Sequence, residues 1–369
     1  MYVQVSYKKQ IIVFLILCVL LLFAVEIGAR VIEYSGENQC EFIGKDAFKN
    51  VEIIKQNQIC EDSNSIMYEV DGILKFIPNQ NMETVNINSH GFRGHDFSEK
   101  KDLDTYRIFI VGGSTIFGSG ATSDDTTIPS FLQKKFEAIH SDQKIEILNA
   151  GIGSAYSYSE KYLIENYLIK FQPDLIIIYS GGNDANNRYG VEYTVPGLPI
   201  SQLTPYVEQT DFVGSVKKFI KEIDYRSPFV LMKIYKGMEQ NFTPSESTTN
   251  QVQELWTTRM GEICKANNDV GIKTVILVQP MLGSGNKQFS TDEKILLENY
   301  GAYMEDTLDI LNKIAGSLVE LENICHGTYD LRMIFDDVKE PLLFDHVHVT
   351  DLGNEIVAEE IYEILINQL

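Results

Sequence analysis

The sequence has no excess of basic residues: 31 Lys and Arg stand against 52 Asp and Glu, which gives a formal net charge of −21. Nucleic-acid binding needs clustered Lys and Arg, so this balance argues against nucleic acid as a partner. It also argues against docking on an anionic membrane through a broad basic face. Because 44% of the residues are hydrophobic, we interpret the acidity as the solvated exterior of a globular protein with a sizeable core.

Motifs for phosphate and metal binding are also missing. The stretch "GGSTIFGSG" has the spacing of a phosphate-binding loop between Gly113 and Gly118, but Ser119 stands where that loop requires Lys. No H-E-x-x-H run occurs, so a metal site would have to start from His346 and His348, two positions apart on one face of a strand. We therefore expect no cofactor and no metal, with that histidine pair as the alternative.

Long hydrophobic runs are absent except for one, which extends without a break from Ile11 to Val25. Counted over residues 11–29, it approaches the roughly 20 residues that span a bilayer. Lys8 and Lys9 precede it, which predicts an inside N-terminus and an exported chain. We expect residues 1–30 to anchor an extracytoplasmic protein in the lipid bilayer. A cleaved signal peptide is the alternative, although Ile27-Gly28-Ala29 is only a fair cleavage site.

Cysteines are few, and an even number of them lies outside the apolar run: Cys40, Cys60, Cys264 and Cys325. Cys40 and Cys60 flank a short polar segment. A disulfide between them would contribute about 3 kcal/mol in a loop-entropy description. Four free thiols are the alternative, and the pairing of the remaining cysteines stays open.

From residue 105 onward, short apolar runs alternate with helical patterns. This alternation predicts parallel strands with helices on both faces of the sheet. We expect an α/β fold, a three-layer α/β/α sandwich with a mostly parallel five-stranded sheet, over residues 105–369, preceded by a juxtamembrane extension at 31–104. A proline-containing insertion at about 186–250 fits no strand–helix unit. The expected strands are 106–113, 144–151, 173–184, 273–280 and 332–338, and one helix is expected over about 291–321.

Small and polar residues follow the first three strands, where ligands bind in such sheets. Ser114 follows the first strand, "NAGIGS" ends the second, and Asn183 follows the third. A hydroxyl surrounded by amide donors suits acyl chemistry through a serine nucleophile. His348 would be the general base, oriented by Asp345 three residues earlier. The alternative for Ser114 is a helix N-cap without a catalytic role.

These segments resemble the four blocks of the SGNH, or GDSL-type, hydrolases: "GGST", "NAGIGS", "GGND" and "DHVH", in that order. The stretch "NINSHGFRG" ahead of them resembles the anchored, exported branch of that family. The resemblance implies a flavodoxin-like sheet and Ser114 as nucleophile, with Asp345 and His348 as its partners. It also implies an oxyanion hole formed by the Ser114 amide, a second-block amide and the Asn183 side chain.

Two positions depart from the family pattern. Gly113 replaces the Asp of the family name, which removes a local hydrogen bond but not the nucleophile. Ser154 stands where the family has a donor glycine, and Gly153 could serve if the turn is shifted by one residue. A backbone N–H supplies the donor in either case.

The expected function is a serine esterase that hydrolyses an O-acyl, for example acetyl, group on a surface carbohydrate or lipid through an acyl-serine. The alternatives are an O-acyltransferase on surface glycans and a non-catalytic glycan-binding or assembly protein on the same scaffold. No protein partner is assigned. Two roles are possible for Arg93: it could bind an anionic substrate group or brace the tether. Asp124 is expected to be a solvated turn residue without a catalytic role.

Overall fold

The computed structural model describes residues 6–36, 40, 42–140, 144–186 and 246–366. The expected insertion at about 186–250 therefore lies almost entirely outside the described residues. The N-terminal helix belongs to one compact unit, and the described residues from Cys40 onward belong to another. Each unit is described by itself.

Helix α1 runs from Tyr7 to Gly36. Its segment Tyr7–Gly28 is long and apolar enough to cross a membrane. A signal sequence near an N-terminus has the same properties.

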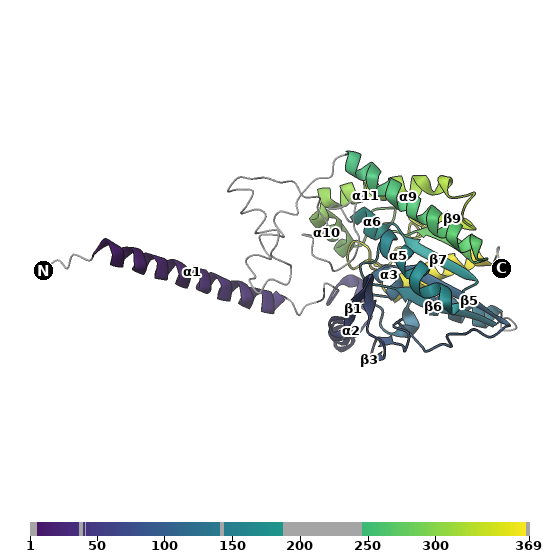
Figure 1. The fold of residues 1–369 in the computed structure, drawn as a ribbon, viewed down its shortest axis with the longest axis horizontal. Helices are drawn as coiled ribbons and strands as arrows, with labels where there is room; N and C mark the ends of the chain where they lie inside the picture. The colour runs from purple at the N-terminus through teal and green to yellow at the C-terminus, as the bar shows by residue number, and fades with distance from the viewer. Residues whose placement is uncertain (1–5, 37–39, 41, 141–143, 187–245, 367–369) are drawn as a thin grey trace. The chain divides into compact units, whose positions relative to one another are not determined.

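The second unit is built on a parallel sheet of five strands (Figure 1). In chain order the strands are β5 (Thr105–Gly112), β6 (Lys144–Gly151), β7 (Leu175–Ser180), β8 (Lys273–Val278) and β9 (Gly327–Asp330), and their spatial order is β6-β5-β7-β8-β9. Every neighbouring pair is parallel. Strands β5, β7 and β8 are mostly apolar and almost entirely buried because both faces of the central sheet are covered.

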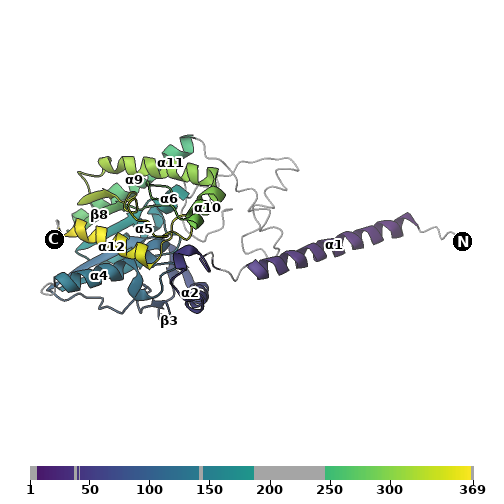
Figure 2. The same ribbon diagram turned by 180° about the vertical axis from the view of Figure 1, so that it is seen from behind.

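Helices cover the two faces of this sheet. Helices α4 (Ile128–Ile139) and α12 (Asp351–Leu365) pack together on the face seen in Figure 2. Helices α5 (Ser157–Leu163), α9 (Glu246–Asp269) and α11 (Ala302–Gly316) cover the face seen in Figure 1. The predicted three-layer α/β/α fold is confirmed.

Two predicted elements were wrong in detail. Residues 332–338 form turns, and the fifth strand is β9, just before them. As an edge strand β9 is only half-buried, so it lacks the apolar run by which the inner strands were found. The helix expected over 291–321 is interrupted at Gly301, whose φ of 47° is not helical. It is divided into α10 (Thr291–Tyr300), α11 and a 3₁₀ turn at Ser317–Glu320.

Residues 40–104 are part of the same compact unit as the sheet. They form a 3₁₀ turn (Asp46–Phe48), helix α2 (Ile53–Ser65) and two small hairpins, β1–β2 (Tyr68–Asp71 and Ile73–Phe76) and β3–β4 (Gln80–Asn81 and Asn86–Ile87). Apolar side chains of these hairpins join the main core under the sheet. The unit holds two disulfides, the expected Cys40–Cys60 bond and a Cys264–Cys325 bond.

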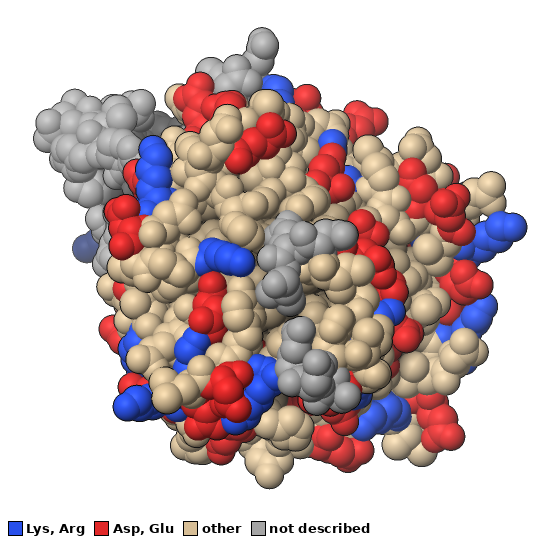
Figure 3. Space-filling model, turned by 90° about the vertical axis from the view of Figure 1, so that its right-hand side faces the viewer, with Lys and Arg blue, Asp and Glu red and all other residues tan. Residues whose placement is uncertain are grey.

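The surface of the described residues carries charges of both signs. On the face drawn in Figure 3, acidic and basic side chains lie side by side. Among the described residues, Lys144 forms a surface ion pair with Asp102, and Lys313 forms one with Asp309.

Candidate active site

Ser114 lies where β5 ends. It is the first residue of the short helix α3 (Ser114–Phe117), and Gly113 is the N-cap. Ser114 is therefore not the cap that the alternative interpretation required, and its hydroxyl is directed elsewhere. Its Oγ lies 2.7 Å from Nε2 of His348.

His348 and Asp345 lie on one loop between residues 342 and 350, which precedes α12. Nδ1 of His348 is 2.6 Å from Oδ2 of Asp345, and the other carboxylate oxygen accepts the backbone N–H groups of Val347 and His348 at 2.8 and 2.7 Å. Burial alone would raise the pKa of Asp345. The neighbouring His348, through its charge and hydrogen bonds, instead holds that pKa well below its usual value. The carboxylate therefore stays ionised, as the orienting partner of an imidazole must be.

The buried carboxylate of Glu293, on α10, holds this loop in place. Its Oε1 accepts the backbone N–H groups of Leu342 and Leu343 at 3.0 and 3.1 Å. Its Oε2 accepts the Ser290 N–H at 2.8 Å and Lys287 Nζ at 3.1 Å. Glu293 is 0% exposed, so a fully buried carboxylate group holds the loop that carries His348 through these hydrogen bonds.

The two backbone amides that are candidate oxyanion donors, those of Gly153 and Ser154, lie on the turn that follows β6. Ala155 N–H bonds the Ile152 carbonyl at 3.1 Å, and Ser154 has a φ of 60°. No hydrogen bond from the Gly153 or Ser154 amide is found among the described residues. Both candidate donors are thus available, on the turn next to the serine.

Asn183, on helix α6 (Gly182–Asn186), brings a carboxamide to the same place. Its Nδ2 donates to the Ala155 carbonyl at 2.6 Å, which leaves one N–H free. A Cβ placed on Gly113 would lie 2.4 Å from this Nδ2. The departure from Asp to Gly at position 113 therefore lets the carboxamide lie directly against the backbone that precedes Ser114. The hydroxyl, the imidazole and several N–H donors together can activate a nucleophile and stabilise an oxyanion.

Two buried acids lie behind Asn183. Ser180 Oγ donates to Glu160 at 2.7 Å, and Asp184 accepts the backbone N–H of Ser157 at 2.9 Å together with the Ser157 hydroxyl. Burial and the negative charge of Asp184 raise the pKa of Glu160 well above its usual value, against the opposing hydrogen bond from Ser180. Burial also raises the pKa of Asp184. Two buried carboxyl groups with raised pKa values thus lie on α5 and α6, next to the carboxamide.

His346, the other half of the possible metal pair, has its Nδ1 4.0 Å from Oδ1 of Asp345. Its ring packs edge-on against Tyr300 at 5.3 Å and Tyr303 at 6.4 Å. Burial lowers the pKa of His346. Within the described ranges, no group of three His, Cys, Asp or Glu side chains lies close enough to hold a metal ion.

Arg93 braces the helix that carries Ser114. Its guanidinium donates to Asp124 at 2.7 Å, to the Phe117 and Gly118 carbonyls at 3.1 and 2.7 Å, and to the Thr84 carbonyl at 2.8 Å. Arg93 was expected either to bind an anionic substrate group or to brace the tether, and these contacts instead join Thr84 to the helix of Ser114. The expectation that Asp124 is a solvated turn residue was wrong, because a buried arginine needs its charge balanced.

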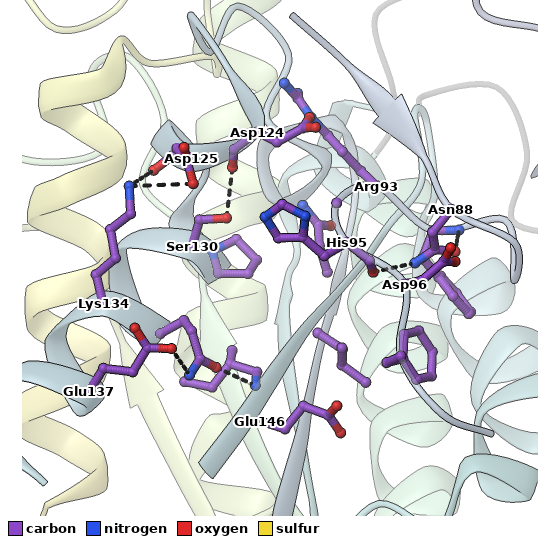
Figure 4. A pocket seen from close by; sticks show the side chains of 18 residues that line it. Asn88, Arg93, His95, Asp96, Asp124, Asp125, Ser130, Lys134, Glu137 and Glu146 are labelled. Carbon is purple, nitrogen blue, oxygen red and sulfur yellow. Dashed lines mark hydrogen bonds and ion pairs between the residues drawn. The ribbon is translucent and has the colours of Figure 1, made fainter. Parts of the chain in front are cut away.

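A cavity of about 300 Å³ opens beside β6 and α4, and Arg93 and Asp124 line it (Figure 4). None of Ser114, Asp345 and His348 lines this cavity. Figure 4 shows its polar groups paired with one another, Lys134 with Asp125 and Ser130 with the Asp124 carbonyl. We assign it no role in the chemistry at the serine.

Sequence reasoning missed Glu293 and the Glu160–Asp184 pair. A signal for Glu293 existed, because "STDE" at 290–293 is a capping box, and the structure shows both of its reciprocal bonds. The contact of Glu293 with Leu342, 49 residues away, has no such local signal.

A family model described as GDSL-like lipase/acylhydrolase matches residues 108–361. Comparison with curated proteins gives no match. Among solved structures, the chain is similar to an α/β hydrolase from the metagenome of Lake Arreo, Spain, with 10% identity, a TM-score of 0.42, and coverage of 70% of this chain and 94% of that one.

It is also similar to a G-D-S-L-family lipolytic protein of Desulfitobacterium hafniense, with 11% identity, a TM-score of 0.39, and coverage of 70% and 98%. A further similar structure is an acetyl xylan esterase, with 15% identity, a TM-score of 0.40, and coverage of 70% and 99%. These similarities are too distant to indicate a substrate.

Proposed function

Because the chain belongs to the GDSL-like lipase/acylhydrolase family and is thus an ester-hydrolysing enzyme, we propose that Ser114, His348 and Asp345 are its catalytic residues. One observation carries this assignment, the continuous hydrogen-bonded chain from Ser114 Oγ through the His348 ring to the Asp345 carboxylate, at 2.7 and 2.6 Å. The first contact joins residues 234 positions apart in the sequence, and together the two contacts give the order of nucleophile, base and orienting acid.

In the first step Nε2 of His348 takes the proton of Ser114 as its Oγ attacks the ester carbonyl. The resulting oxyanion accepts hydrogen bonds from the Ser114 amide, from the Ser154 or Gly153 amide and from Nδ2 of Asn183. Collapse of this intermediate breaks the bond to the alcohol, which leaves with the proton from His348. Water, activated by the same imidazole, then hydrolyses the acyl-serine and restores the hydroxyl.

The proposed substrate is an O-acyl, for example acetyl, ester on a carbohydrate or lipid of the cell surface. Two observations support this location: the apolar helix Tyr7–Gly28, and the two disulfides, which are typical of proteins outside the reducing cytosol. In this proposal residues 1–30 anchor the chain in the bilayer, residues 31–104 follow the anchor, and residues 105–369 form the extracytoplasmic hydrolase domain.

A fluorophosphonate probe tests the nucleophile directly, because it labels activated serines. The wild-type chain should be labelled and should hydrolyse p-nitrophenyl acetate, and Ser114→Ala should abolish both. Ser119→Ala is the matched control, since Ser119 lies on the same glycine-rich loop and should keep both activities. Folded wild-type protein that is neither labelled nor active would overturn the proposal.

A second measurement separates hydrolysis from acyl transfer. With an O-acetylated glycan as substrate, hydrolysis releases one acetate for each ester lost. Acetate release that falls short of ester loss, with acetyl groups gained by an added glycan acceptor, would contradict hydrolysis.

A further inference from the structure

Phe344 lies immediately before Asp345 and covers the ring of His348. The two rings are stacked, with centroids 5.7 Å apart and planes 12° from parallel. Phe344 is 5% exposed. One face of the imidazole is thus held by an aromatic ring that the family blocks do not include.

The other side of Phe344 packs against residues that follow the N-terminal helix by only a few positions. Its ring meets Phe42 at 5.5 Å and Phe48 at 5.3 Å, both edge-on, and those two rings stack on each other at 4.8 Å. Ile59 and Cys60 complete this cluster, which is separate from the main core.

The loop after Ser114 closes the remaining side of the Phe344 ring. A Cβ on Gly120 would lie 2.5 Å from Cζ of Phe344, so the ring rests directly on the glycine backbone. Phe344 is therefore confined between the serine loop, His348 and the pair Phe42–Phe48.

The Cys40–Cys60 disulfide closes the segment that carries Phe42 and Phe48 into a covalent loop. The Gln56 side chain ties it internally, because it donates to the Phe48 and Val51 carbonyls at 3.0 and 2.7 Å and accepts the Gly44 N–H at 2.8 Å. A covalent closure and three hydrogen bonds thus hold the two phenylalanines in one arrangement.

We propose that residues 40–60 complete the active site: their disulfide-closed aromatic cluster presses Phe344 onto His348 and so positions the imidazole between Asp345 and Ser114. Phe344, Phe42 and Phe48 are positioning residues in this arrangement. The inference rests on the proposed role of His348 as general base. It extends the catalytic machinery beyond the four family blocks to the segment that follows the proposed anchor in the sequence.

The physical reason is that base catalysis depends steeply on geometry. Misplacing a reacting group by about 1 Å costs on the order of 10²-fold in rate. An imidazole without the stacked ring can turn away from Ser114 Oγ, while Asp345 still accepts its Nδ1–H. Loosening the cluster should therefore lower kcat and the labelling rate of Ser114 and leave KM nearly unchanged.

The test compares three full-length proteins well below their unfolding transitions: wild type, Cys40→Ala/Cys60→Ala and Cys264→Ala/Cys325→Ala. The second pair is the matched control, because it joins α9 to the start of β9, the end of the sheet away from Ser114. We expect kcat on p-nitrophenyl acetate, and the fluorophosphonate labelling rate, to fall about tenfold in the first variant and to stay at the wild-type value in the control.

Phe344→Leu keeps the inference testable if the first disulfide variant fails to fold, because it removes the stacked ring and retains an apolar side chain. It should show the same fall in kcat with KM unchanged. Wild-type kcat in Phe344→Leu, or an equal fall in both disulfide variants, would overturn the inference. Failure of the proposed function looks different, since the wild-type protein itself would then be unlabelled and inactive.

Discussion

The substitution Glu293→Gln should be strongly destabilising, although it changes one atom type on a residue outside the catalytic blocks. Glu293 accepts four hydrogen bonds, from Leu342, Leu343, Ser290 and Lys287. A glutamine has one acceptor oxygen. If that oxygen keeps the two loop amides, its NH₂ group must face two donors, the Ser290 N–H and the Lys287 ammonium.

The expected cost follows from the burial of the ion pair. Glu293 and Lys287 have side chains 0% and 4% exposed, so removal of the negative charge leaves an ammonium without its anion in the interior. Breaking a buried pair from one side costs about 3–5 kcal/mol. Lys287→Met should cost less, about 2 kcal/mol, because three backbone N–H groups still satisfy the carboxylate.

Urea unfolding can be followed through the single tryptophan, Trp256, which is 0% exposed. Lys313→Met is the control for removing a lysine, since its pair with Asp309 is exposed and should be worth less than about 1 kcal/mol. The double variant Glu293→Gln/Lys287→Met should cost less than the sum of the single variants, because it removes the orphaned charge. Equal costs for Glu293→Gln and Lys313→Met would refute the reasoning.

Three further predictions follow from the same site. Glu160→Gln should remove a pH dependence of stability, because the pKa of Glu160 is raised in the folded state. Above the ordinary Glu pKa of about 4.3, folding therefore takes up a proton. The stability of the wild-type protein then falls as pH rises, by at most about 1.4 kcal/mol per pH unit. Urea midpoints at pH 5, 7 and 9 should therefore diverge between the two proteins, whereas Glu355→Gln, at an exposed position, should run parallel to wild type. Asn183→Ala should lower kcat on p-nitrophenyl acetate by about 10²–10³-fold, and full activity would exclude this carboxamide from the oxyanion hole. Gly113→Ala should displace the same carboxamide, since the new Cβ would lie 2.4 Å from its Nδ2, and a kcat equal to that of the wild type would show that the close approach has no catalytic value.

The inner strands could be predicted from the sequence because nearly every residue along them is buried. Strands β5, β7 and β8 are covered on both faces, so each is an apolar run that local composition reveals. The edge strand β9 has no such run, and the sequence pattern pointed instead to 332–338, where buried Phe335 and exposed Met333 alternate in turns. Local pattern thus identifies what is buried on all sides and fails at an edge.

The candidate site divides in the same way. Ser114, Asn183 and the pair Asp345–His348 stand in short motifs at strand ends, where backbone geometry is set by a few neighbouring residues, and these motifs could be recognised in the sequence. Of the two buried acids, Asp184 is the last residue of the "GGND" motif, and Glu160 lies in the helical stretch that follows "NAGIGS". The raised pKa values of these two acids, however, depend on burial that no motif records.

By itself the sequence determined the layered α/β architecture, the apolar N-terminal helix, the even set of cysteines and the side chains available for acyl chemistry. Only the tertiary structure decided which distant groups support them: Glu293 beneath the histidine loop, Arg93 against the helix of Ser114, and Phe42 and Phe48 against Phe344. The physical reason is the distance along the sequence over which each kind of interaction acts. Periodicity and turn chemistry act over a few neighbouring positions. Packing and buried charge pairing join segments that are distant in the sequence, such as those of Phe42 and Phe344, and these contacts form only when the chain has folded.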